Sequence, residues 1–379
     1  MTVLRKGFSD GSSRMRVNTR KGITVKKAFH VTLADIARKL DVSTVTVSKA
    51  LRGHPDISEE TVRKIKKLAR EMGYTPNRIA SSLSSRKSNT IGVIIPKVAH
   101  FFFSSVIEAI YDAAFETGYE IILTVSQENA AREARHLRSL LSMRVDGLIV
   151  SVSEQTKDAS IFADVKATGV PLTFMDRVPD LEGFSKVVVD DRGGAALATE
   201  HAIKIGHRRI AHLGGYQHTS IGRERYRGFA EAMAHHGLTV NPRWVTFGGF
   251  SEEEGYNGFM KIFSGSEKPE FVFAATFPIA LGVYRAAEHL HLRIPDDIDI
   301  IGFGNSGFNQ VLSPPLSYIE QPTLDLGRKA LEITLEHIRR GPKFQPTTVT
   351  LPTSLVMART GIRAGTPLNA ASPPVATRT

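Results

Sequence analysis

The first pattern along the chain consists of three short amphipathic segments between residues 32 and 73. Each begins at a residue that favours the N-cap of a helix, namely Thr32, Ser43 and Ser58. Apolar residues then recur at three- and four-residue spacing, and Gly73 ends the third segment. Two short helices joined by a tight turn and braced by a third predict a helix-turn-helix unit. The apolar positions are Leu33, Ile36, Ala37 and Leu40, then Val42, Val47, Ala50 and Leu51, and finally Val62, Ile65, Leu68, Ala69 and Met72.

A second pattern begins near residue 90, where short apolar runs alternate with longer amphipathic segments. Such runs are typical of parallel strands that are covered by helices on both faces. This part of the chain is therefore predicted to be an α/β fold. The runs are residues 91–95, 121–125, 147–150, 172–175, 187–189, 210–213, 271–275 and 298–301.

Charge is distributed unevenly between these two parts. Residues 1–90 contain 20 Lys and Arg against 7 Asp and Glu, a balance of +13, whereas the remainder contains 29 against 31, a balance of −2. A cationic unit ahead of a near-neutral body indicates a protein that binds a polyanion. Charge alone does not distinguish DNA, RNA and acidic lipid, and the helical spacing alone also fits a generic three-helix bundle.

The composition excludes several other classes of protein. The 379 residues include no cysteine, which excludes disulfides, thiolate zinc sites and cysteine nucleophiles. No apolar run approaches the roughly 18 residues of a membrane span, and no apolar signal-peptide core follows the N-terminal basic residues. We therefore expect a cytoplasmic protein with no membrane partner. Residues 1–30 are expected to be a disordered basic arm, either inert or touching phosphates, and residues 362–379 a disordered tail.

The segment after the third helix makes the pattern specific. Pro76 precedes one to two helical turns in which Ile79, Ala80 and Leu83 share a side, and so short a helix is not stable alone in water. This segment resembles the hinge of the lactose and galactose repressor family, and the resemblance continues to about residue 360. It is carried by Thr32-Leu33-Ala34-Asp35-Ile36-Ala37, Val42-Ser43, Thr46-Val47-Ser48-Lys49-Ala50-Leu51, Gly73-Tyr74, Pro76-Asn77-Arg78 and residues 80–83.

The resemblance implies a mode of DNA binding. The second helix enters the major groove, and the hinge folds on DNA and inserts Leu83 into the minor groove. Val45 stands where several relatives carry a polar residue, so it offers only apolar contact, for example to a thymine methyl. The expected base contacts are Thr44, Val45, Thr46, Lys49 and Leu83. The expected phosphate contacts are Thr32, Ser43, Ser48, Asn77, Arg78, Arg86 and Lys87.

The resemblance also implies a two-lobed core, like that of periplasmic sugar-binding proteins, with a ligand between the lobes. Ligands of parallel sheets lie beyond the carboxyl ends of the strands, which directs attention to the residues after each run. In the family pattern Asp176 and Arg225 clamp the effector and Phe250 stacks on it. The full set of expected effector residues is Phe102, Phe103, Asp176, Arg177, Asp190, Arg225, Phe250, Thr276 and Asn305.

Two departures from the family pattern concern this cleft. Thr276-Phe277 stands where relatives commonly carry an Asn-Asp pair, and Gly304-Asn305 stands where many carry an Asp. Two polar anchors are lost in this way. We therefore expect a more apolar cleft, whose effector differs from the simple sugars of the best-known relatives.

Signals of catalysis are weak. Residues 302–307 match the GxGxxG dinucleotide fingerprint, but Pro314-Pro315 follows too soon for the long helix that this motif requires, so a loop is expected. The pairs His235-His236 and His289 with His291 lack a third ligand at metal-binding spacing. No nucleophile elbow, P-loop or zinc-protease motif is present. We expect no enzyme activity, cofactor or metal.

These observations predict a DNA-binding transcriptional regulator, by family default a repressor, of the bacterial cytoplasm and its nucleoid. It would bind a pseudo-palindromic operator as a homodimer and respond to a small metabolite, with a sugar or sugar derivative as the first expectation. The expected boundaries are 31–76 for the helix-turn-helix domain, 77–88 for the hinge helix and 89–361 for the two-lobed domain. One alternative is a solute-binding or enzymatic α/β protein with an unrelated basic N-terminus, and another is an architectural DNA binder without a ligand.

Overall fold

The computed structural model describes residues 31–75, 87–99, 101–305 and 307–362. The chain divides into two compact units, Met1–Ser81 and Ser82–Thr379. Among the described residues the first unit holds three helices, and the second holds two parallel sheets with their helices. No helix in these ranges has the length and apolar character needed to cross a membrane.

The first unit, which we call the head, has the three helices that its apolar spacing predicts. They are α1 (Leu33–Leu40), α2 (Thr44–Leu51) and α3 (Glu59–Glu71). The predicted caps are in place, because the hydroxyls of Thr32, Ser43 and Ser58 each accept a hydrogen bond from a backbone N–H in the first turn. The apolar faces then close a small core of Ile36, Ala37, Val47, Ala50, Ile65 and Ala69.

The second unit consists of two lobes, each built on a six-stranded sheet. The strand order is β11-β5-β4-β3-β1-β2 in the first lobe and β12-β10-β9-β8-β6-β7 in the second. All neighbouring strands are parallel except β12, which runs antiparallel to β10. The α/β prediction is therefore confirmed.

The elements of the first lobe are β1 (Thr90–Ile95), α5 (Phe101–Thr117), β2 (Glu120–Val125), α6 (Ala130–Ser142), β3 (Gly147–Val150), α7 (Ser160–Thr168), β4 (Leu172–Met175), β5 (Ser185–Val189), α12 (Thr323–Arg340), the 3₁₀ turn η3 (Gly341–Lys343) and β11 (Thr348–Leu351). Those of the second lobe are α8 (Asp191–Lys204), β6 (Ile210–Gly215), α9 (Ser220–His235), η1 (Pro242–Trp244), β7 (Val245–Gly248), α10 (Glu252–Phe263), β8 (Phe271–Ala274), α11 (Phe277–His289), β9 (Asp299–Phe303), η2 (Asn309–Val311), β10 (Ser317–Glu320) and β12 (Ser354–Val356).

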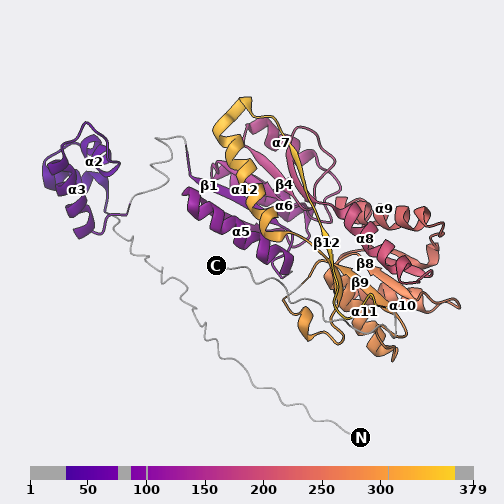
Figure 1. Ribbon diagram of the computed structural model, residues 1–379. Coiled ribbons are helices and arrows are strands. Elements are labelled where there is room, and N and C mark those ends of the chain that lie inside the picture. Colours follow the sequence, from indigo (N-terminus) through magenta and orange to yellow (C-terminus); the bar gives the residue numbers. More distant parts are fainter. Residues whose placement is uncertain (1–30, 76–86, 100, 306, 363–379) are drawn as a thin grey trace, which may run out of the picture. The chain divides into compact units, whose positions relative to one another are not determined.

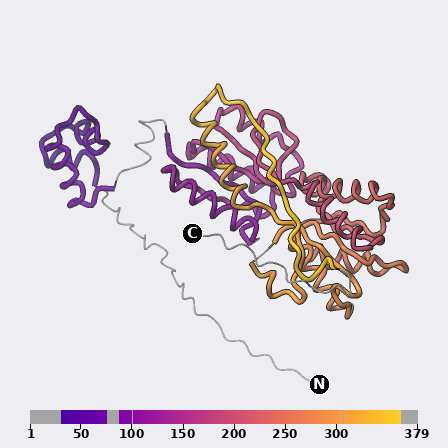
Figure 2. The backbone as a smooth tube through the Cα atoms, viewed as in Figure 1, coloured from indigo at the N-terminus to yellow at the C-terminus, as the bar shows by residue number. Residues whose placement is uncertain are grey.

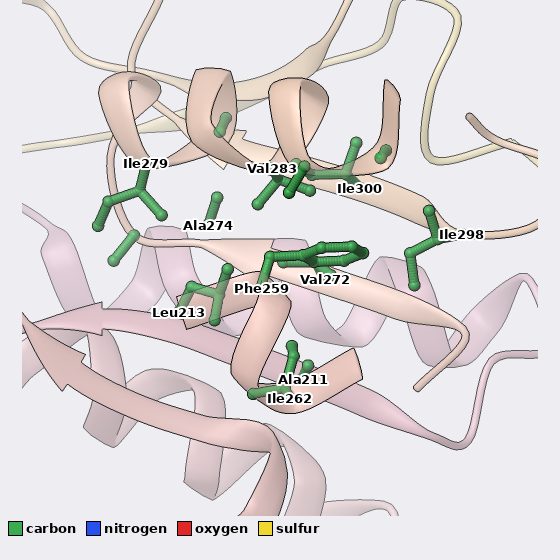
Figure 3. Packing of buried hydrophobic residues seen from close by; sticks show 14 of the residues in the cluster. Ala211, Leu213, Phe259, Ile262, Val272, Ala274, Ile279, Val283, Ile298 and Ile300 are labelled. Carbon is green, nitrogen blue, oxygen red and sulfur yellow. The ribbon is translucent and has the colours of Figure 1, made fainter. Parts of the chain in front are cut away.

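Strand alternation explains how both faces of each sheet are buried. In β8, Val272 and Ala274 face the core beneath α10 and α11, whereas Phe271 and Phe273 face the core beneath α8 and α9. Figure 3 shows the first of these cores, in which Phe259 packs over Val272. Strands buried on both faces are apolar throughout, which is why the pattern of apolar runs located them.

The chain passes between the lobes three times. The crossings lie at Asp190 between β5 and α8, at residues 321–322 between β10 and α12, and at residues 352–353 between β11 and β12. Figures 1 and 2 show α12 and the last strands, in yellow, returning to the first lobe and then passing to the second. Asp190 N donates to Leu351 O at 2.8 Å and Thr353 Oγ1 donates to Asp190 O at 3.2 Å, so the first and third crossings are joined.

The loop after β9 contains no long helix in the described residues, as the two prolines predict. Strands β7, β10, β11 and β12 are absent from the predicted set. The predicted arm, most of the hinge (77–86) and nearly all of the tail lie outside the described residues. Lys87 and Ser88, at the end of the predicted hinge helix, have no regular secondary structure.

Candidate functional site

A cavity of about 360 Å³ lies between the two lobes of the second unit. It is bounded by residues that follow strands of both sheets, as expected for ligands of parallel sheets. The first lobe contributes Ala99, Phe101, Phe102, Phe103, Asp176 and Arg177. The second lobe and the crossing at Gln321 contribute Ile221, Arg225, Phe250, Ser251, Glu252, Thr276, Phe277, Pro278, Leu281, Phe303, Gly304, Asn305, Phe308 and Gln321.

Arg225 is held rigidly in the floor of this cavity. Its side chain is 2% exposed, and Nε and Nη2 each lie 2.7 Å from Asp191 Oδ1. Nη1 donates to Ala275 O at 2.5 Å, and the guanidinium lies 3.7 Å from the centre of the Phe303 ring. Burial raises the pKa of Asp191 to about 6, against the lowering effect of Arg225. The guanidinium is thus held in a buried ion pair with Asp191.

Asp176 places a carboxyl in the same floor. It is buried, and its Oδ2 accepts a hydrogen bond from Ser151 Oγ at 3.3 Å. Burial raises the pKa of Asp176, while Arg177 and Arg225 oppose that rise. Its φ of 59° lies in the left-handed region, where residues other than glycine are strained. Such strain is typical of functional sites, where the surrounding structure enforces a side-chain direction.

Arg177 connects the lobes through Phe250. Its Nη1 donates to both Glu128 oxygens, at 2.8 and 3.0 Å, within the first lobe. Its guanidinium lies 4.7 Å from the centre of the Phe250 ring in the second lobe. That ring packs on Gly215, where an added Cβ would lie only 1.8 Å from the ring. Phe250 is therefore held between a glycine and an arginine at the wall of the cavity.

Eight of the nine predicted effector residues line the cavity, and Asp190 does not. Asp190 follows β5 directly, but the chain leaves the first lobe at that residue, and its carboxylate accepts a hydrogen bond from Gly193 N at 2.8 Å as the N-cap of α8. The next residue, Asp191, is the acid that holds Arg225 in the floor of the cavity. Both acids follow β5, which indicated that an acid lies near the cavity, but only the fold shows that Asp191 rather than Asp190 points inward.

The predicted base contacts of the head are described in part. Thr44 and Val45 begin α2 with exposed side chains, and Val45 is 62% exposed. The Thr46 hydroxyl lies 2.8 Å from Ser43 Oγ, and Lys49 Nζ lies 2.9 Å from Asp56 Oδ2. Ser43 thus serves as the cap of α2, and Ser48 is half-buried in that helix. Leu83, Asn77, Arg78 and Arg86 lie outside the described residues.

Two further predicted phosphate contacts are described, namely Thr32 directly before α1 and Lys87 shortly before β1. Thr32 forms a reciprocal capping box with Asp35, whose Oδ2 accepts from Thr32 N at 2.9 Å. Lys87 is exposed just before β1.

Asp146 ties the start of the second unit to its first lobe. Its Oδ1 accepts hydrogen bonds from Ser88 N and Ser88 Oγ at 2.8 and 2.9 Å, and its Oδ2 accepts one from Asn89 N at 2.9 Å. This contact joins residues nearly 60 positions apart, so no local sequence pattern indicates it. It fixes the point at which the segment from the head enters the lobe.

These two units define a class of protein, a DNA-binding regulator with a ligand-binding core. Residues 32–77 match the family of bacterial regulatory proteins called the lacI family, and residues 199–360 match a periplasmic binding protein-like domain. The chain belongs to the lacI family. Members of this family are DNA-binding transcriptional repressors that respond to small-molecule effectors and act as dimers on operator DNA.

Individual relatives cover most of the chain. It is 32% identical to the HTH-type transcriptional repressor PurR of Photobacterium profundum, over 81% of this chain and 92% of the relative. It is also 32% identical to the ribose operon repressor of Haemophilus influenzae, over 86% and 97%. The Lac repressor dimer bound to operator and the anti-inducer ONPF has a TM-score of 0.78 at 27% identity, covering 88% of this chain and all of that one. These relatives are repressors, not enzymes.

Proposed function

We propose that this chain represses transcription under the control of a small metabolite bound in the cavity between its lobes, and that it has no enzyme activity. The main support is that the buried side chains of Arg225 and Asp176 lie in the floor of one cavity between the lobes. The same chain also has a helix-turn-helix head. Buried, oriented charges suit recognition of a ligand, and the described residues contain no group of three or more side chains that could hold a metal ion. We place the protein in the cytoplasm, where its operator would lie.

The proposed effector contacts are the eight predicted residues that line the cavity. Arg225 and Asp176 orient polar groups of the ligand, and Phe250 supplies an aromatic face. The first expectation for the ligand is a sugar or sugar derivative. Among solved structures similar to this chain is the transcriptional regulator CelR in complex with cellobiose, at 26% identity and a TM-score of 0.67. The proposed contacts are Phe102, Phe103, Asp176, Arg177, Arg225, Phe250, Thr276 and Asn305.

For DNA binding, we propose that Thr44, Val45, Thr46 and Lys49 reach base edges from α2 and that Leu83 enters the minor groove. Thr32, Ser43, Ser48, Asn77, Arg78, Arg86 and Lys87 are proposed to contact phosphates. The proposed functional boundaries are 31–76 for the head, 77–88 for the hinge and 89–361 for the core.

The cavity contacts both lobes, so a ligand binds more tightly to one relative orientation of the lobes than to another. That difference in affinity couples the cavity to the segment that leaves the core at Ser88, which Asp146 holds. In a dimer, a change in lobe orientation would change the separation of the two hinge segments on the operator.

The test uses the full chain and a variant that lacks residues 1–87. Sugars, sugar acids and nucleosides are screened by thermal shift, because a ligand that binds only the folded state must stabilise it by about 2.7 kcal/mol at a hundredfold excess over Kd. The same ligand should stabilise both proteins, and only the full chain should select a common sequence from random DNA at stated salt.

Two outcomes separate the alternatives, and a third tests the role of Arg225. A truncated protein that keeps every activity, with no DNA selected by the full chain, would favour a solute-binding or enzymatic α/β protein. DNA binding without sequence preference and without a ligand would favour an architectural protein. Arg225→Ala should lose the response to the ligand, and a normal response in that variant would remove Arg225 from the site.

A further inference from the structure

The lining of the interlobe cavity differs between its floor and its mouth. Asp176 and Arg225 are 5% and 2% exposed, so they lie in the floor, together with the buried rings of Phe103, Phe250 and Phe303. Phe101 and Phe308 are 45% and 66% exposed, so they lie at the mouth. Seven of the twenty lining residues are phenylalanines, namely Phe101, Phe102, Phe103, Phe250, Phe277, Phe303 and Phe308.

The charged groups around the cavity are largely engaged within the protein. Each nitrogen of Arg225 already lies within hydrogen-bond distance of Asp191 or Ala275 O. Arg177 is paired with Glu128, and Glu252 Oε1 accepts from Arg285 Nη1 at 2.8 Å. A ligand with hydroxyl groups on all sides would bury several of them against phenyl rings, which provide no strong hydrogen-bond partner. The part of the lining that Phe101 and Phe308 form therefore suits an apolar ring rather than hydroxyl groups.

The two phenylalanines at the mouth come from different lobes. Phe101 begins α5 in the first lobe, and Phe308 lies in the loop after β9 in the second. Their ring centres are 5.9 Å apart with the planes at 80°, an edge-to-face contact. The contact depends on Gly307, because a Cβ there would lie 2.7 Å from Phe101 Cζ. A planar group added to this pair would contact both lobes at once.

We propose that the effector carries an aromatic or heteroaromatic ring, which packs against the Phe101–Phe308 pair, and a hydroxylated part, which lies against Asp176 and Arg225. This inference rests on the proposed function of the cavity and narrows the ligand class. Aryl glycosides and nucleosides share this chemistry, and a free sugar lacks it. Ring binding at the mouth favours the arrangement of lobes in which the two phenylalanines meet.

The test compares ligands that differ only in the ring. One arm titrates the full-length protein with methyl and phenyl glycosides of glucose, galactose and ribose by calorimetry, and the other arm compares ribose with adenosine and uridine. In at least one arm the ring-bearing member should bind at least tenfold more tightly. The arm that responds identifies the source of the ring.

Phe308→Ala provides the second measurement, with Val311→Ala as the matched control. Val311 is 76% exposed, lies three residues further on and does not line the cavity. The ring advantage should fall below threefold in Phe308→Ala and stay above tenfold in Val311→Ala, with folding of both checked by circular dichroism.

The outcomes also separate this inference from the function on which it rests. Equal binding of ring-bearing and ring-free members in both arms, or a ring advantage that survives Phe308→Ala, would overturn the ring proposal and leave an effector site for sugars. Absence of binding by every probe in both arms would overturn the ring proposal and the sugar-derivative ligand together.

Discussion

Replacement of Arg225 by alanine should destabilise the second lobe in a manner that depends on pH. In the wild type the buried Asp191 has a pKa of about 6, and the Arg225 guanidinium favours its charged form. In the variant Asp191 stays buried but loses that guanidinium. Documented buried carboxyls reach pKa values of about 8. Suppose that the pKa of Asp191 rises from about 6 to about 8. The electrostatic loss of folding stability is then close to zero at pH 5, where Asp191 holds its proton in both proteins. At pH 8 the loss is about 2 kcal/mol, at about 1.4 kcal/mol per pKa unit.

The direction follows from the unfolded chain. There the Asp191 carboxyl ionises near pH 3.9, so the folded protein binds this proton to a higher pH and stability falls as pH rises. In the wild type that fall ends near the folded pKa of about 6. In Arg225→Ala it should continue to about pH 8. The lost packing on Phe303 and the lost hydrogen bond to Ala275 O reduce stability equally at both pH values.

Urea denaturation at pH 5 and pH 8 measures this difference. The sole tryptophan, Trp244, is buried in the same lobe as Arg225 and reports its unfolding by fluorescence. The same substitution in an Asp191→Asn background should show a smaller difference between the two pH values, because only the influence of Arg225 on other groups such as Asp176 then remains. An equal loss at pH 5 and pH 8 in the Asp191 protein would refute the claim that the guanidinium compensates a buried charge.

Three further predictions concern the head and its connection to the core. Thr32→Ala removes the capping box of α1 and should lower its stability by about 1 kcal/mol, seen as faster hydrogen exchange of its amides in the full chain; unchanged exchange would contradict this. Asp146→Ala leaves the Ser88 and Asn89 amides without their acceptor, so ligand affinity should stay within threefold of the wild type while the effect of ligand on DNA binding, measured by fluorescence anisotropy, weakens. A full response would exclude Asp146 from the coupling. Leu83→Ala should weaken operator binding far more than non-specific binding, and equal losses would exclude minor-groove insertion.

The head and the inner strands other than β10 could be predicted because their signals are local. Each helix of the head begins at a capping side chain a few residues from its apolar face, as at Thr32 and Asp35. Inner strands such as β8 are apolar on both faces and stand out as continuous runs. The strands β11 and β12 lie at sheet edges, and β11 alternates between exposed and half-buried residues, so its pattern is not distinct from that of a loop.

The site was predictable only as far as chain position determines it. Asp176 and Phe102 follow strands whose ends meet at the cavity, and both side chains line it. The pairing of Arg225 with Asp191, the contact of Phe101 with Phe308 and the binding of Ser88 by Asp146 all join distant segments. These contacts depend on how distant segments pack within each lobe and, for Phe101 with Phe308, on how the crossings orient the lobes, and no spacing rule in one sequence encodes that.

The path of the chain through the lobes has a consequence for synthesis on the ribosome. The head is continuous in sequence and can fold as soon as it emerges. The first lobe needs α12 and β11, which follow the whole second lobe in the sequence, and the second lobe needs β12 at residues 354–356. A nascent chain that ends before β11 therefore carries a complete head and two incomplete lobes with exposed sheet edges. During translation the part that binds DNA is finished roughly 280 residues before the part that regulates it.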